Sequence, residues 1–325
     1  MDSTLRPMST SQVLDRTFHL YRNNFWLFAG IAALPPAVIL VAQTGFVLLA
    51  FLFSIPKLNP FATGIAFAAG VLLMIVLYLL VLSLATGATV YAVSRVHLGH
   101  AVKISESYRA IRPLVWRIVR IVITVAIRFA GAMAIAIAIG FAPSFLLSLG
   151  PLHLNSGSSA MVGWLVGLLT VAGVIVCVIW ALRLYCSYQL AIPACVLERL
   201  GAAACLKRSR FLSKGKCVHR ILLVLFLAGV LGYVLTLAFS IPVFIVAMLA
   251  MEKYAALAIP MAIWQYFAGF LAGTLAGPIA TIALALLYYD ERVRKEAFDL
   301  QLMMEAMGEQ APQQMAAAAP APTIG

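Results

Sequence analysis

Two arginines are the ionisable residues that stand inside long apolar stretches of the sequence, and they are its main candidates for binding chemistry. Arg128 follows Arg120 by eight residues, about 12 Å along a helix, and Arg183 lies a similar way from the end of its own stretch. A guanidinium in a membrane helix costs several kcal/mol unless it reaches the headgroup layer or finds a partner. Arg128 and Arg183 are therefore expected either to extend to the headgroups or to bind an anionic headgroup or substrate phosphate inside the bundle.

Other residue types offer little for catalysis. None of the 11 carboxylates lies in the middle of an apolar stretch, although proton- or sodium-coupled transport usually needs such a group. His97 and His100 have a spacing that two metal ligands can share, but zinc takes three or four protein ligands, so solvated loop histidines are expected. The five cysteines match no zinc pattern and are expected to pack as small apolar side chains. We expect no enzymatic activity and no cofactor.

The composition places these residues in a membrane protein. Hydrophobic residues make up 64% of the 325 positions and charged residues 10%, against about 45–50% and about 25% in soluble domains. A soluble chain this apolar has too few polar residues to cover its core, and disorder requires low hydrophobicity. The apolar stretches are continuous, whereas a membrane barrel alternates apolar and polar residues. The sequence therefore predicts an all-α, polytopic transmembrane helix bundle.

Six apolar stretches are long enough to cross a bilayer, which takes about 20 helical residues. Pro35-Pro36 is expected to kink the first of them, because proline removes a backbone donor and clashes with the preceding turn. We predict one six-span membrane domain over residues 1–302, followed by a disordered tail at 303–325 that is rich in Gln, Ala and Pro. The spans are predicted at approximately 25–55, 61–93, 118–149, 161–190, 218–251 and 254–289.

The net charge of +12 is sorted along the chain. Most of the 23 Lys and Arg residues lie before the first span, between the second and third, between the fourth and fifth, or after the sixth, whereas the opposite loops hold only Lys57 and Lys253. The positive-inside rule then places both termini in the cytoplasm, in a multi-pass protein of the plasma or inner membrane. The positive charge is assigned to anionic headgroups at the cytoplasmic face, and no nucleic acid is expected as a partner.

A basic amphipathic stretch precedes spans one, three and five, which indicates a threefold parallel repeat. The first stretch begins with a capping box formed by Ser9 and Gln12, and its apolar face is expected to hold Leu14, Phe18, Tyr21 and Phe25. The second and third occupy residues 103–120 and 201–216. Each unit is expected to be one helix lying in the headgroup layer followed by a transmembrane hairpin. These helices are interpreted as topological anchors, with a lipid- or partner-binding ring as the alternative.

Glycines recur every four residues in two of the predicted spans. They are Gly163 and Gly167 in the fourth, and Gly269, Gly273 and Gly277 in the sixth. Small residues at this spacing let helices approach closely. We expect them to serve helix packing within the fold, with dimerisation or substrate passage as alternatives.

Several short motifs carry a family resemblance. They are Arg6-Pro7-Met8-Ser9, the stretch from Leu14 to Phe25, the stretch from Leu190 to Glu198 followed by Leu206-Lys207-Arg208-Ser209, and the stretch from Leu287 to Leu300. Over about residues 5–302 the chain resembles the bacterial six-span proteins related to the glycerophosphoryl diester phosphodiesterase membrane domain. In the enzymes so named, a separate soluble domain rich in His and carboxylates performs metal-assisted cleavage, and this sequence contains no such domain. The resemblance implies membrane location and fold, and no activity.

Two functions are left as expectations. The first is a non-enzymatic scaffold or accessory component of the cell envelope, with membrane-protein partners or as a homo-oligomer. The alternative is an uncoupled transporter or binder of lipids or amphiphilic anions, with Arg128 and Arg183 as headgroup ligands. A membrane enzyme acting on phospholipid comes third, because the sequence offers no cluster of acids or histidines.

Overall fold

The computed structural model describes residues 8–53, 60–149, 156–249 and 254–296. Of these residues 92% are helical and none lies in a strand, which confirms the all-α prediction. Five helices are long and apolar enough to cross a membrane, and a bent helix pair makes a sixth if it is counted as one span. The predicted tail at 303–325 and the loops that hold Lys57 and Lys253 lie outside the described residues.

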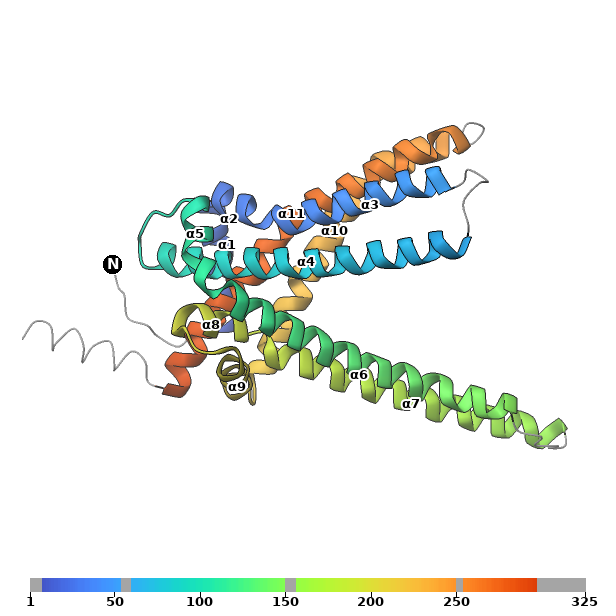
Figure 1. Cartoon of the computed structure of the whole chain (residues 1–325). Helices are drawn as coiled ribbons and strands as arrows, with labels where there is room; N and C mark the ends of the chain where they lie inside the picture. The colour runs from blue at the N-terminus through green and yellow to red at the C-terminus, as the bar shows by residue number, and fades with distance from the viewer. Residues whose placement is uncertain (1–7, 54–59, 150–155, 250–253, 297–325) are drawn as a thin grey trace, which may run out of the picture.

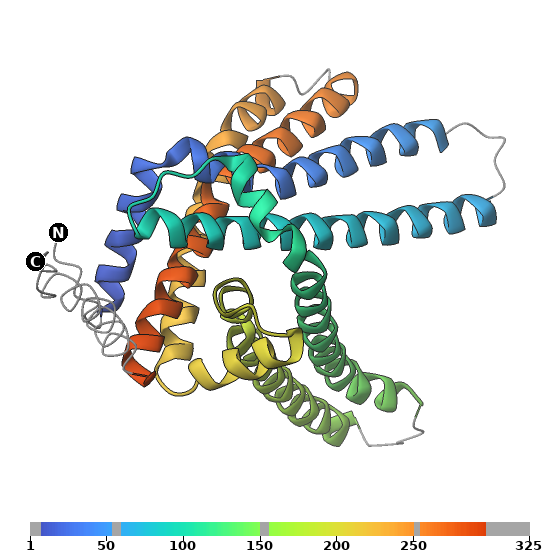
Figure 2. The ribbon, with the colours of Figure 1, turned by 60° about the vertical axis from the view of Figure 1, so that its left-hand side comes forward.

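The long helices form three hairpins that fan out from one end of the molecule (Figures 1 and 2). The hairpins are α3 (Leu34–Phe53) with α4 (Pro60–His97), α6 (Val115–Leu149) with α7 (Ser156–Tyr188), and α10 (Cys217–Leu249) with α11 (Tyr254–Glu296). Most helix ends fall within a few residues of the predicted spans, but α7 begins about one turn before 161 and α11 continues past the predicted end at 289. Figure 2 shows the α6–α7 hairpin diverging from the other two.

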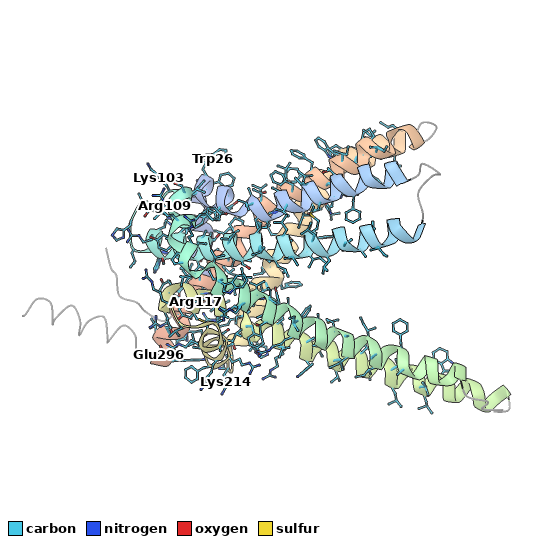
Figure 3. The ribbon with its side chains drawn as sticks, in the orientation of Figure 1. Trp26, Lys103, Arg109, Arg117, Lys214 and Glu296 are labelled. Atoms are coloured by element: carbon cyan, nitrogen blue, oxygen red, sulfur yellow. The ribbon has the colours of Figure 1, made fainter. Side chains whose placement is uncertain are left out.

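Short helices gather where the three hairpins meet, and we call this the basic end (Figure 1). They are α1 (Thr10–Asn23), α2 (Phe25–Ala32), α5 (Ile104–Ile111) with a 3-10 turn at Arg112–Leu114, α8 (Ala191–Glu198) and α9 (Ala202–Leu212). Figure 3 places the labelled Lys103, Arg109, Arg117 and Lys214 at this end. The three predicted amphipathic segments form α1, α5 and α9, and each packs on a long helix: α1 on α11, α5 on α4, and α9 on α6 and α7.

Helix α1 buries a face that only partly matches the predicted one. Its capping box is confirmed, since the Ser9 hydroxyl accepts from the Gln12 amide and the Gln12 side chain accepts from the Ser9 amide. The buried residues are Val13, Thr17 and Leu20, whereas Phe18 is 49% exposed. The prediction was wrong for Phe18, but Tyr21 is half-buried and donates its hydroxyl to the Leu275 carbonyl of α11 at 2.9 Å. The buried face is the one that packs on α11.

Each of the three amphipathic helices buries a small hydroxyl side chain. Thr17 of α1, Ser107 of α5 and Ser209 of α9 are all fully buried. Thr17 and Ser107 donate to carbonyls one turn earlier in their helices, and Ser209 donates to the Ser187 carbonyl at 2.8 Å. A hydroxyl satisfied in this way can be buried at little cost. A buried hydroxyl in each of the three helices supports the threefold repeat that the sequence predicts.

The predicted kink lies between α2 and α3. The two helices are bent by 40° at a break next to Ala33, directly before Pro35 and Pro36, whose rings prevent a regular helix there. The bend brings Pro36 against α11, where its Cγ would lie 3.0 Å from a Cβ added at Gly273.

The buried core of the molecule lies at the basic end. Most of α8 is buried, including Ala191, Ala194 and Cys195, and α8 contacts α4, α6, α9 and α11. In α11, 56% of the most apolar window is buried, but at most 17% of the corresponding windows of the α4, α6, α7 and α10 spans is buried. The basic end therefore holds the fold together, while the long helices present apolar surface outward, as helices in hydrocarbon do.

Candidate functional site

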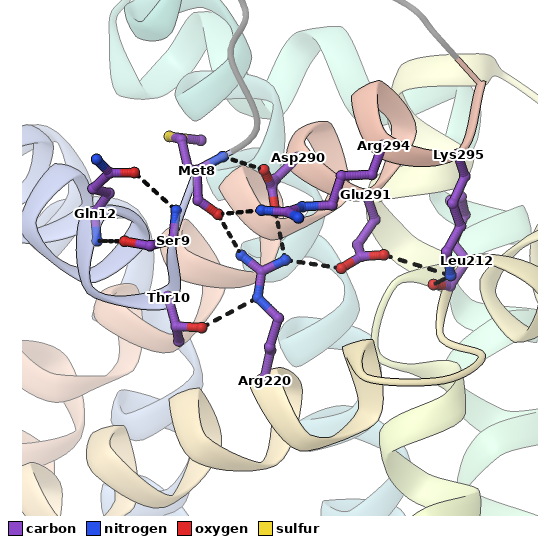
Figure 4. A network of polar contacts seen from close by, with 10 residues as sticks. All are labelled: Met8, Ser9, Thr10, Gln12, Leu212, Arg220, Asp290, Glu291, Arg294 and Lys295. Atoms are coloured by element: carbon purple, nitrogen blue, oxygen red, sulfur yellow. Dashed lines mark hydrogen bonds and ion pairs between the residues drawn. The ribbon is translucent and has the colours of Figure 1, made fainter.

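Arg220 of α10 is the centre of a network of polar contacts at the basic end (Figure 4). Its Nη1 atom lies 2.5 Å from Asp290 Oδ2 and 2.9 Å from Glu291 Oε1, both on α11. Its other nitrogens donate to the Met8 carbonyl at 3.0 Å and to the Thr10 hydroxyl at 3.2 Å. One guanidinium thus ties α1, α10 and α11 together.

The two carboxylates of this network are buried and fully engaged. Asp290 also accepts from the Met8 amide at 2.6 Å and from Arg294 Nε at 2.9 Å. Glu291 lies 3.5 Å from Lys295 Nζ. The Asp290–Arg294 pair joins residues one helical turn apart on α11. Because every charge here has a partner within the chain, this network is structural and offers no free group to a ligand.

A second network surrounds Glu198 at the end of α8. Glu198 accepts from Arg208 at 3.1 Å and from the Tyr288 hydroxyl, and lies 3.5 Å from Arg292. Arg208 also donates to Glu296 at 2.6 Å. Burial lowers the pKa of Arg208, but its hydrogen bonds to Glu296 and Glu198 outweigh that effect and raise the pKa overall. This network joins α8, α9 and α11 by paired charges.

A third cluster, at the junction of α6, α7 and α9, differs because its cations share a neutral partner. Arg128 of α6 and Arg210 of α9 both donate to the hydroxyl of Tyr188, the last residue of α7. Their Cζ atoms lie 5.2 Å and 4.8 Å from the centroid of the Tyr188 ring, in cation–π contact. The ring is 3% exposed, while both arginines are exposed. We call Arg128, Tyr188 and Arg210 the arginine clamp.

Helix direction explains why Arg128 reaches this cluster. The Cα–Cβ bond in a helix tilts toward the N-terminus, which for α6 lies at the basic end. Arg183 sits on the antiparallel α7, so the same tilt directs it away from that end. Arg183 is exposed and forms no side-chain hydrogen bond or ion pair with any described residue. The structure brings Arg128 together with Arg210, and not with Arg183.

The arginine clamp carries positive charge that the chain does not balance. Two guanidinium groups held against one tyrosine repel each other, and solvent screens that repulsion because both side chains are exposed. Among the described residues, no carboxylate forms an ion pair with Arg128 or Arg210. The ion pairs at the basic end use Glu198, Asp290, Glu291 and Glu296, with Arg208, Arg220, Arg292, Arg294 and Lys295. The clamp thus differs from the two other networks in having no carboxylate partner among the described residues.

The repeated glycines lie in two different settings. Cβ atoms added at Gly273 and Gly277 would lie 3.0 Å from Pro36 and 4.0 Å from Ala32, so these two are at a helix crossing. Added at Gly163, Gly167 or Gly269, a Cβ meets no described atom within 4 Å. For those three positions the expectation of close packing within the chain is corrected: Gly163 and Gly167 lie on an open face of α7, and Gly269 faces a cavity.

The histidines and cysteines follow the predictions in part. His97 is half-buried and stacks on Tyr289 with 5.9 Å between ring centroids, so it is not the solvated residue expected, whereas His100 is exposed. No group of three or more metal-ligating side chains occurs within the described ranges. Four of the cysteines are buried and Cys177 is half-buried. A hydrogen bond with Cys195, together with burial, raises the pKa of the Cys205 thiol.

Two members of the arginine clamp were missed in the sequence. Arg210 stands among several basic residues near the third amphipathic segment, and Tyr188 ends an apolar stretch. A local signal existed for Tyr188, because a tyrosine at the end of a membrane span is typical of the interface. Nothing local distinguishes Arg210 from its basic neighbours.

Comparison of the chain with protein-family models, curated proteins and solved structures finds no match. The resemblance to the phosphodiesterase-related membrane domain therefore stays a prediction.

Proposed function

We propose that this protein is a non-enzymatic, multi-pass protein of the plasma or inner membrane that binds anionic phospholipid headgroups on its cytoplasmic side. The observation that supports this function best is the arginine clamp, where Arg128 and Arg210 converge on Tyr188 without a carboxylate counter-ion among the described residues. Arginine guanidinium groups are suited to phosphate because they donate in a planar fork.

The position of the clamp supports a lipid as the source of the phosphate. Arg128 lies on α6, a helix apolar enough to span a membrane, and it extends toward the basic end, where headgroups would lie in the orientation given by the positive-inside rule. Each basic residue near an anionic leaflet contributes roughly 1 kcal/mol. Arg183, exposed on the neighbouring α7, is not proposed to belong to the clamp.

Native mass spectrometry of the purified protein, titrated with phosphatidylglycerol, tests the proposal. In the double variant Arg128→Gln/Arg210→Gln, the Kd for phosphatidylglycerol should rise between about tenfold and about thirtyfold, because two contacts of roughly 1 kcal/mol each are lost. Zwitterionic phosphatidylcholine should bind the wild type more weakly and respond less to the substitutions.

The matched control is Lys207→Gln/Lys216→Gln, which removes the same charge from two exposed residues at the basic end. We expect this variant to bind phosphatidylglycerol nearly as the wild type does. Equal losses of affinity in the two double variants would show that only the overall charge matters, and the clamp would then be discarded as a site.

A scaffold role is the second candidate, and an open face on α7 favours it. Trp164 is 82% exposed beside Gly163 and Gly167, and these residues line a groove with Leu168 and Val171. A partner helix could pack closely on such a surface. Cross-linking in native membranes from a cysteine placed at position 164 should capture a membrane-protein partner or a second copy of this chain. Recovery of the uncross-linked monomer alone would count against this role.

A further inference from the structure

A cavity lies between α2, α3, α4 and α11, in the part of the molecule formed by the apolar helices. Its volume is about 310 Å³, at the lower end of the roughly 300–1,000 Å³ typical of small-molecule sites. It is partly enclosed, so that a bound molecule can extend out of it. Pro35, Gln43, Tyr78, Gly269 and Thr281 are among the residues that line it.

Two features of the backbone create this space. The 40° bend between α2 and α3 directs α3 away from the axis of α2. Three of the α11 residues that line the cavity are glycines, which add no side chain to it. A Cβ added at Gly273 would lie 3.0 Å from Pro36, so α3 and α11 are close together at this point. A Cβ added at Gly269 meets no described atom within 4 Å. The cavity therefore follows from the fold and is not filled by any described side chain.

The lining is apolar except for several uncharged polar groups. Thr86 and Thr89 donate to carbonyls of their own helix at 2.7 Å and 2.8 Å. Gln43 and Tyr78 form no hydrogen bond with any described residue. An amide or phenol in hydrocarbon without a partner costs several kcal/mol, so a hydrogen bond from an occupant to either side chain would be favourable. No charged side chain lines the cavity, and a charged ligand would have no counter-ion there.

We propose that this cavity binds an uncharged membrane amphiphile, an apolar chain that carries a hydroxyl or carbonyl group, with Gln43 and Tyr78 as its hydrogen-bonding partners. The chain leaves through the open side of the cavity into the bilayer. The site is separate from the arginine clamp, since no residue is shared between them, and it does not depend on the proposed binding of anionic headgroups.

Photo-labelling in nanodiscs tests this site. The probe is a sixteen-carbon alcohol that carries a diazirine near the hydroxyl and a terminal alkyne. After irradiation, mass spectrometry of the digested protein should find the label concentrated in α3, α4 and α11. Labelling spread evenly over all long apolar helices would overturn the proposal.

Two variants sharpen the test. Gly269→Phe should reduce the labelling of α3, α4 and α11 about fivefold or more, because the ring enters the cavity. The matched control Gly229→Phe adds the same ring to an exposed glycine of α10 with nothing within 4 Å, and labelling should be unchanged. Equal labelling in the Gly269→Phe and wild-type proteins would overturn the site.

The polar recognition is tested separately with Gln43→Leu/Tyr78→Phe, which keeps the size of both side chains. Labelling by the alcohol should fall about fivefold, as expected for losing two hydrogen bonds, while labelling by a diazirine alkane of the same length should not. Equal effects on the two probes would overturn the role of Gln43 and Tyr78. Arg128→Gln/Arg210→Gln should leave both signals intact.

Discussion

Replacing Arg220 with methionine should destabilise the protein by roughly 3 kcal/mol, because it leaves buried carboxylates short of their central partner. The side chains of Asp290 and Glu291 are 0% and 5% exposed, so water cannot replace the lost guanidinium. The same change also removes the donors to Met8 and Thr10 that attach α1 to α10. Loss of the monodisperse peak on heating, followed by size-exclusion chromatography, should occur at a clearly lower temperature than in the wild type.

Replacing Arg220, Asp290 and Glu291 together by uncharged residues distinguishes the effect of the lost ion pairs on stability from the effect of lost packing. In Arg220→Met/Asp290→Asn/Glu291→Gln no buried charge is left without its partner, and much of the stability should return. Arg294→Met serves as a milder control, because its side chain is 39% exposed and exposed pairs contribute about 0–1 kcal/mol. A triple variant no more stable than Arg220→Met would contradict this account of the network.

Substitution of Gly273 by leucine should destabilise the protein by about 1–3 kcal/mol, the usual cost of overpacking. A Cβ at this position would lie 3.0 Å and 3.3 Å from two atoms of the Pro36 ring, which is rigid and cannot turn aside. The bend between α2 and α3 would have to move away from α11. Thermal stability in the same detergent is the measurement.

The control for this substitution is Gly229→Leu on α10, where an added Cβ meets no described atom within 4 Å. Both changes gain the helix propensity of leucine over glycine, roughly 1 kcal/mol, so their difference isolates the contact with Pro36. If Gly273→Leu were as stable as Gly229→Leu, α3 and α11 would not be packed as described.

Features that depend on neighbours in the chain were predictable. The apolar stretches gave the long helices to within a few residues in most cases, and Pro35-Pro36 gave the position of the bend. Ser9 and Gln12 gave the first capping box. Each depends on propensity, proline chemistry or helical spacing, and these act over one or two turns.

Features that depend on packing between distant segments were not predictable. The burial of α8, the face that α1 presents to α11, and the partners of Arg220 all needed the arrangement of the hairpins. Arg128 was found from the sequence because a charge inside an apolar stretch stands out. Arg210 was not, because it resembles every other basic residue near it.

The sequence by itself determined an all-helical architecture, helices apolar enough to span a membrane, and the position of the bend in the first of them. Only the tertiary structure decided which positive charges are balanced. Arg220 finds Asp290 about 70 residues away, while Arg128 and Arg210 meet at Tyr188 without an acid. The physical reason is range: hydrophobicity and helical period act along the chain, whereas charge pairing, the cavity beside Gly269 and the arginine clamp depend on how separate hairpins pack together.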